Sequence, residues 1–182
     1  MSKLLKRALK ISITPAILMI AGKFLGIMIP SIIYDLEFFV ENNIQGLFSI
    51  QILFTNPDVT LFINSISNIV MLIILALPTI YFIIKTSIYQ SSLQNPRTVV
   101  KMTKLNILKW ITKQDTTFLQ IFIWCTFLII SSAVIIIQSL QNISYQWTGI
   151  VAGVVSLFCL WGTVKTFELE TDKIYPKENR YY

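Results

Sequence analysis

The sequence predicts an all-α membrane protein with four transmembrane helices arranged as two hairpins. Three observations lead to this fold class: 54% of the 182 residues are hydrophobic, only 13% are charged, and the charges gather in separate blocks. Soluble domains interleave about 25% charged residues with apolar ones at periods near 3.6 or 2. Long apolar runs separated by basic blocks are instead typical of chains that cross a bilayer several times.

Residues 11–33 form the first predicted span, because about 20 apolar residues are needed to cross the hydrocarbon core. A basic segment precedes this run, so a cleaved signal peptide is the alternative interpretation. No small-x-small cleavage site stands out, and we therefore expect an uncleaved helix. Within it, Gly22 and Gly26 form a G-x-x-x-G pair, which predicts close packing against another helix.

Lys23 lies beside this glycine pair and near the expected middle of the bilayer. A charge inside the hydrocarbon region is costly and is by default a candidate functional site. None of the four predicted spans contains a carboxylate that would neutralise it. Two interpretations stay open: Lys23 contacts a partner or lines a path together with Asn64 and Asn68, or it snorkels and bonds within the bundle.

The segment from Leu36 to Phe54 carries acidic residues but no basic one. It is too polar to span a bilayer and too apolar for a free loop, so it predicts an interfacial or re-entrant helix on the outer side. Asn56 and Pro57 then predict a helix start, with Asn56 as the N-cap and Pro57 as the first helical residue. The second span follows at 61–84.

A basic cytoplasmic loop at 85–116 joins the two halves of the chain. From Lys85 to Gln114 it carries six cations and no acidic residue. Asn95-Pro96 and the apolar positions that follow predict a cytoplasmic amphipathic helix on the membrane surface; a plain solvated connector is the alternative. Its cations predict contacts with anionic lipid headgroups. They are Arg97, Lys101, Lys104, Lys109 and Lys113.

The third and fourth spans are expected at 117–137 and 145–167, joined by a short uncharged turn that predicts a tight hairpin. Gly149, Gly153 and Ser156 give the fourth span a face of small residues, which predicts helix packing there.

Charge distribution predicts the orientation. Fourteen of the fifteen Lys and Arg residues lie in the segments on one side of the predicted spans, and Lys23 is the remaining one. Cytoplasmic segments carry the excess of Lys and Arg, so both termini are expected in the cytoplasm. We expect a single transmembrane domain over 1–182, integral to a bacterial cytoplasmic membrane.

The sequence offers no constellation of residues for catalysis. Histidine is absent, both cysteines fall inside apolar runs, and no Walker loop, G-x-S-x-G or C-x-x-C motif occurs. We therefore expect no enzyme, no cofactor and no metal site. The net charge of +6 does not indicate nucleic-acid binding, because the cations lie in blocks next to the membrane.

These observations predict a small non-catalytic component of a larger membrane complex, with other membrane subunits and anionic lipids as partners. The alternative is an oligomeric transporter or channel subunit for a small solute or ion, with Lys23, Asn64 and Asn68 lining the path.

Overall fold

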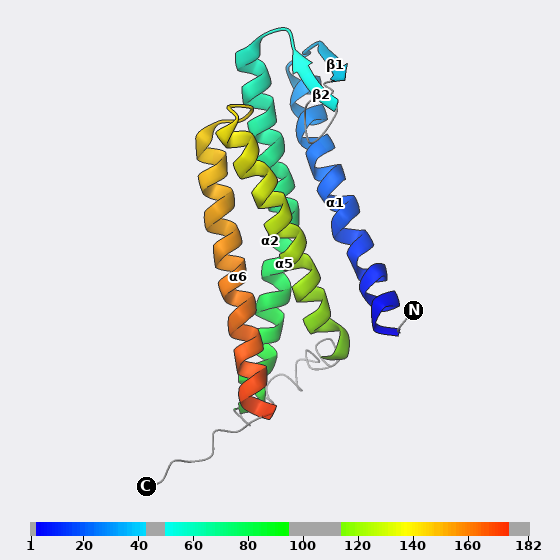
Figure 1. The fold of residues 1–182 in the computed structure, drawn as a ribbon, viewed down its shortest axis with the longest axis vertical. Coiled ribbons are helices and arrows are strands. Elements are labelled where there is room, and N and C mark those ends of the chain that lie inside the picture. Colours follow the sequence, from blue (N-terminus) through cyan, green and yellow to red (C-terminus); the bar gives the residue numbers. More distant parts are fainter. Residues whose placement is uncertain (1–2, 43–49, 95–113, 175–182) are drawn as a thin grey trace.

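The computed structural model describes residues 3–42, 50–94 and 114–174 of the chain. These residues form four long helices and one β-hairpin: α1 (Lys3–Ile33), β1 (Phe38–Asn42), β2 (Ile50–Phe54), α2 (Pro57–Gln94), α5 (Gln114–Leu140) and α6 (Gln146–Ile174). The helices run side by side along the long axis of the molecule (Figure 1). Helix α1 packs against α2, and α5 packs against α6, so the two predicted helical hairpins are confirmed.

All four predicted spans correspond, to within two residues of their predicted starts or by lying inside, to helical segments that are long and apolar enough to cross a membrane. These helical segments are Leu5–Ile33, Pro57–Ser87, Leu119–Leu140 and Gln146–Phe167. Helix α2 contains 38 residues, more than the 20 or so that cross the hydrocarbon core. Its ends therefore extend beyond the apolar layer.

The connection between α1 and α2 differs from the sequence prediction, which placed an interfacial helix over Leu36 to Phe54. Strands β1 and β2 pair in antiparallel fashion, with Phe38 opposite Phe54 and Asn42 opposite Ile50. The helix prediction was wrong. The paired stretches, FFVEN and IQILF, are rich in aromatic and β-branched residues, which fit the pleated surface of a strand.

The central loop is shorter than predicted, because α2 continues through residues 85–94 and α5 begins at Gln114. The intervening residues 95–113 lie outside the described residues. The predicted cytoplasmic amphipathic helix and the five cations assigned to lipid headgroups are therefore outside the described part of the chain.

The start of α2 is fixed as the sequence predicted. The Asn56 side-chain carbonyl accepts a hydrogen bond from the Asp58 backbone N–H at 3.0 Å, which is an N-cap interaction. The Phe54 backbone N–H donates to the Thr60 hydroxyl at 3.0 Å, which ties β2 to the first turn of α2. The β-hairpin is thereby anchored to the helix that follows it.

The C-terminal ends of α1 and α5 are closed in the same way. Each is followed by a residue in the left-handed region, Asp35 with φ 49° and Asn142 with φ 57°. After α5, the Ile143 N–H donates to the Gln138 carbonyl at 2.9 Å, as in a Schellman motif. Asn142 therefore makes the tight turn into α6 without a glycine.

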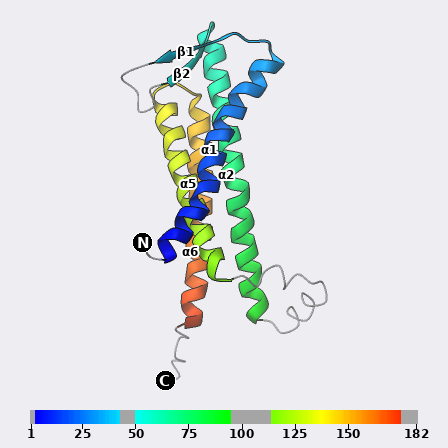
Figure 2. The ribbon, with the colours of Figure 1, turned by 90° about the vertical axis from the view of Figure 1, so that its right-hand side faces the viewer.

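Helix α2 lies at the centre of the bundle and contacts α1, α5 and α6. Figure 2 shows α1 crossing in front of α2 and α5, with α6 on the far side. The buried hydrophobic core joins α2, α5 and α6; its members are Met71, Leu72, Leu75, Ala76, Trp124, Leu128, Ile135, Ala152 and Cys159. A smaller cluster at the outer end packs Ile27 and Ile63 against Phe54.

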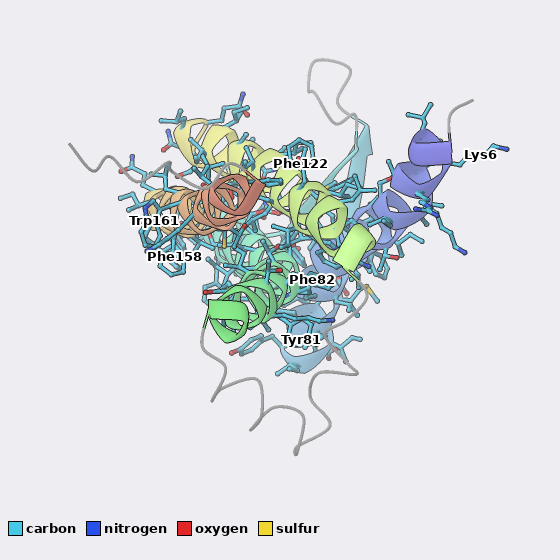
Figure 3. The ribbon with its side chains drawn as sticks, turned by 90° about the horizontal axis from the view of Figure 1, so that it is seen from below. Lys6, Tyr81, Phe82, Phe122, Phe158 and Trp161 are labelled. Atoms are coloured by element: carbon cyan, nitrogen blue, oxygen red, sulfur yellow. The ribbon has the colours of Figure 1, made fainter. Side chains whose placement is uncertain are left out.

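The start of α1 and the ends of α2 and α6 lie at one end of the bundle, where Lys6, Lys85 and Lys165 are found. The view from that end shows Lys6 projecting away from the other helices (Figure 3). Asp35 and Asp58 lie at the opposite end, next to the β-hairpin. Among the described residues, the Lys and Arg residues other than Lys23 lie toward the first of these ends and none lies beside the β-hairpin.

This separation gives a test of orientation in intact cells. We expect Gln141→Cys, at the exposed turn after α5, to react with a membrane-impermeant maleimide added outside, because basic segments are retained in the cytoplasm. Lys6→Cys should react only after permeabilisation. The two native cysteines are buried and give a low background. The opposite labelling pattern would contradict the predicted topology.

Candidate functional site

A hydrogen bond between α1 and α2 joins two of the residues singled out in the sequence. The Lys23 ammonium donates to the Asn68 side-chain carbonyl, with 2.6 Å between Nζ and Oδ1. Asn68 is completely buried, and Lys23 is half-buried. The structure therefore places Lys23 beside α2, with part of its side chain still accessible from the surface of the bundle.

The glycines beside Lys23 explain how the two helices come so close. A Cβ atom on Gly26 would collide with the Ser67 backbone Cα, and one on Gly22 would lie 3.1 Å from the Met71 Cα. The Ser67 hydroxyl then donates to the Lys23 backbone carbonyl at 2.7 Å. Small residues on both helices thus bring the backbones together, and a hydroxyl fixes their register.

By residue count, Lys23 lies near the middle of the predicted span 11–33 and Asn68 lies in the first third of the predicted span 61–84. With a rise of 1.5 Å per residue, Lys23 is about 15 Å from the outer end of α1 at Ile33, and Asn68 is about 16 Å from the start of α2 at Pro57. The bond to Asn68 shows that the ammonium is directed toward α2 within the bundle.

The pairing determines how the amide of Asn68 is oriented. Lysine has only donors, so the amide oxygen faces Nζ and the amide nitrogen faces away. That nitrogen, Nδ2, is buried and has no hydrogen-bond partner among the described residues. The amide partner is neutral, so the positive charge of Lys23 is solvated by one dipole and is not cancelled.

Asn64 lies one turn before Asn68 on α2 and is half-buried. No hydrogen bond from Asn64 occurs within the described ranges, so the structure does not bring it into the Lys23–Asn68 contact. The hydroxyl of Ser65, the next residue, accepts from the Tyr145 N–H at 2.9 Å. This contact links the start of α6 to α2.

The small residues of α6 differ in their surroundings. A Cβ on Gly149 would lie 2.8 Å from the Ser139 Oγ of α5, whereas one on Gly153 would meet only the Ile136 Cδ1 at 4.0 Å. The Ser156 hydroxyl donates to the Gly153 carbonyl within its own helix. The close approach between α5 and α6 is therefore at Gly149.

Some buried polar residues and one close contact were missed by the sequence reasoning. Gly162 of α6 packs against α2, where its Cβ would lie 3.2 Å from the Ile83 Cγ2. The side chains of Ser131, Ser132 and Gln138 on α5 each have a buried oxygen without a partner in the described structure. Their hydroxyl and amide chemistry was visible in the sequence, but which face of α5 they occupy was not.

Aromatic residues gather on α6 toward the basic end. The Lys165 Nζ lies 5.0 Å from the centre of the Trp161 ring. Phe158 and Trp161 lie together on the outside of the bundle, with ring centres 6.4 Å apart (Figure 3). A tryptophan next to a lysine at the end of a span is typical of the boundary between hydrocarbon and headgroups.

The described groups at this site are one ammonium and one buried amide. Within the described residues, no group of three or more His, Cys, Asp or Glu side chains is placed to hold a metal ion. Cys125 and Cys159 are free thiols buried in the bundle. The Lys23–Asn68 pair combines a cation with a buried amide, an arrangement suited to holding an anionic or acceptor group.

Comparisons with known proteins give no family for this chain. It matches no protein-family model, no curated protein and no solved structure.

Proposed function

We propose that this four-span chain is a non-catalytic subunit of a larger membrane assembly. The observation that carries the proposal is the positive charge of Lys23 at mid-depth. Within the described residues, its ammonium bonds only to the neutral amide of Asn68. Charged side chains in spans are usually paired with one another or face a wet cavity. No carboxylate lies in any of the four spans, so a pairing charge has to come from another chain.

The surroundings of Asn68 favour this proposal over a transporter or channel subunit. A residue that lines a solute path has to be accessible to the solute, whereas Asn68 is fully enclosed between helices. Its neighbour Ser67 is also buried and bonds to the backbone of α1. The polar groups at mid-depth therefore hold helices together, as expected of a packed subunit.

The proposed setting is a bacterial cytoplasmic membrane with both termini in the cytoplasm. The basic end of the bundle supports this orientation through the excess of Lys and Arg found in cytoplasmic segments. Anionic headgroups of the inner leaflet are the proposed lipid contacts of that end, at Lys165 beside Trp161 and in the central loop.

Two measurements on the full chain test the proposed function. In mild detergent extracts of its own membranes, the protein should migrate as an assembly much larger than its 20.9 kDa, whereas the chain purified alone should not. In vesicles, the purified chain should produce no solute or ion flux above protein-free controls. Flux from the purified chain that disappears in Asn68→Leu would instead establish the transporter function.

A further inference from the structure

We propose that Lys23 and the exposed apolar seam of α1 beside it, formed by Ile13, Ile17, Ile20 and Phe24, bind a transmembrane helix of a partner subunit. That helix carries an Asp or Glu at mid-depth. This inference rests on the proposed function and deepens it, because it names the surface and the chemistry of the partner. Three observations support it: the ammonium has hydrogen-bond donors that the described residues do not use, a row of exposed apolar residues lies beside it, and the four spans of this chain contain no carboxylate.

The ammonium group of Lys23 has more hydrogen-bond donors than the described residues use. It carries three N–H groups, and its one hydrogen bond within the described residues is the bond to Asn68. Asn68 holds the ammonium in place at mid-depth and leaves the charge itself uncancelled. A carboxylate that approached the half-buried lysine from the surface would supply both acceptors and the opposite charge.

The surface next to Lys23 is a row of exposed apolar side chains at helical spacing. Ile13, Ile17, Ile20 and Phe24 recur at spacings of four, three and four residues, and each is more than half exposed. This is the spacing at which one helix packs along another with a small crossing angle. Lys23 is three residues beyond Ile20 and adjacent to Phe24, so a helix on this seam would place a mid-span residue beside the ammonium.

Two other occupants fit this site poorly. Lipid phosphates lie at the edge of the hydrocarbon core, about 15 Å from its middle, which is beyond the reach of a lysine already bonded to Asn68. A second copy of this chain has no carboxylate in any of its four spans. It would therefore bring a second lysine, and like charges, to the same depth.

The binding test uses the full chain in lipid vesicles and a synthetic leucine-rich transmembrane peptide with one Glu at its centre. The matched peptide has Gln at that position. Energy transfer between a dye on the peptide and a dye on the exposed turn, introduced through Gln141→Cys, reports association. We expect the Glu peptide to bind roughly tenfold more tightly than the Gln peptide, as one added charge pair in a low dielectric would give.

Variants at Lys23 assign that preference to the proposed site. Lys23→Met should abolish the preference for Glu, and Lys23→Arg should keep it. Lys10→Met, the same change at an exposed position on the same helix, should leave it intact. Protection of Cys125 and Cys159 from thiol reagents shows whether each variant is folded.

Equal binding of the two peptides to the unmodified chain would overturn the inference, as would a Glu preference that persists in folded Lys23→Met. The unmodified chain alone therefore decides the case even if Lys23→Met does not fold. A large assembly in native membranes together with equal peptide binding would leave the subunit function standing and refute this site. Absence of the assembly together with a Lys23-dependent preference for Glu would refute the subunit function and leave this binding site standing.

Discussion

Gly26→Ala should separate α1 from α2 and destabilise the bundle by about 1–3 kcal/mol, the usual range for overpacking a close contact. The added methyl would meet the Ser67 backbone Cα and lie 3.1 Å from the Ser67 Cβ. Backbone atoms cannot rotate away as a flexible side chain can, so one helix has to move. The greater helix propensity of alanine, about 1 kcal/mol relative to glycine, offsets only part of the loss.

Labelling of the buried thiols measures this effect. Cys125 and Cys159 become reactive when the bundle opens, so their modification during a titration with sodium dodecyl sulfate gives the free energy of unfolding. Gly153→Ala is the matched control, because its methyl would meet only the Ile136 Cδ1 at 4.0 Å. Similar losses in the two variants would show that the Gly26 contact is not the tight one.

Asn68→Leu should cost about 1.5–3 kcal/mol, the contribution of a hydrogen bond to a charged group. The substitution removes the acceptor of Lys23 and leaves the ammonium in hydrocarbon, where a central lysine already costs about 2.5–3.5 kcal/mol on insertion scales. Lys23→Met removes the charge itself and should therefore be close to neutral or stabilising. The double variant should be more stable than Asn68→Leu alone, because the uncompensated charge is gone.

The same unfolding titration measures these differences. Asn64→Leu serves as the control, since Asn64 is the same residue type one turn away and makes no hydrogen bond within the described residues. It should change stability much less than Asn68→Leu. Additive effects of Lys23→Met and Asn68→Leu would contradict the expected coupling between the two side chains.

The four spans could be predicted because a bilayer demands long apolar runs, and those runs are visible residue by residue. The N-cap at Asn56 could be predicted because it depends only on its immediate neighbours. The β-hairpin was missed for the opposite reason. Its residues, Phe38–Asn42 and Ile50–Phe54, suit an interfacial helix by polarity and a strand by side-chain shape, and cross-strand pairing decided the outcome.

The partner of Lys23 could not be predicted, although both residues had been singled out. Lys23 and Asn68 are 45 positions apart, and their meeting depends on the register between two antiparallel helices. That register is set by the contacts of Gly22 and Gly26 with α2, and sequence spacing within α1 does not specify which residues of α2 they meet. The same limit applies to Gly162, whose neighbour Ile83 lies on a helix from the other half of the chain.

Each half of the chain contains a close contact at a glycine: Gly26 against Ser67 in the first half, and Gly149 against Ser139 in the second. These contacts hold the two helices of each hairpin against one another, α1 against α2 and α5 against α6. The contacts between the halves extend along the bundle, from the Ser65–Tyr145 hydrogen bond near one end, through the shared core, to the Phe82–Trp124 ring contact toward the other. Helix α2 therefore serves both halves: it is the partner of α1 in one hairpin and the surface on which the other hairpin packs.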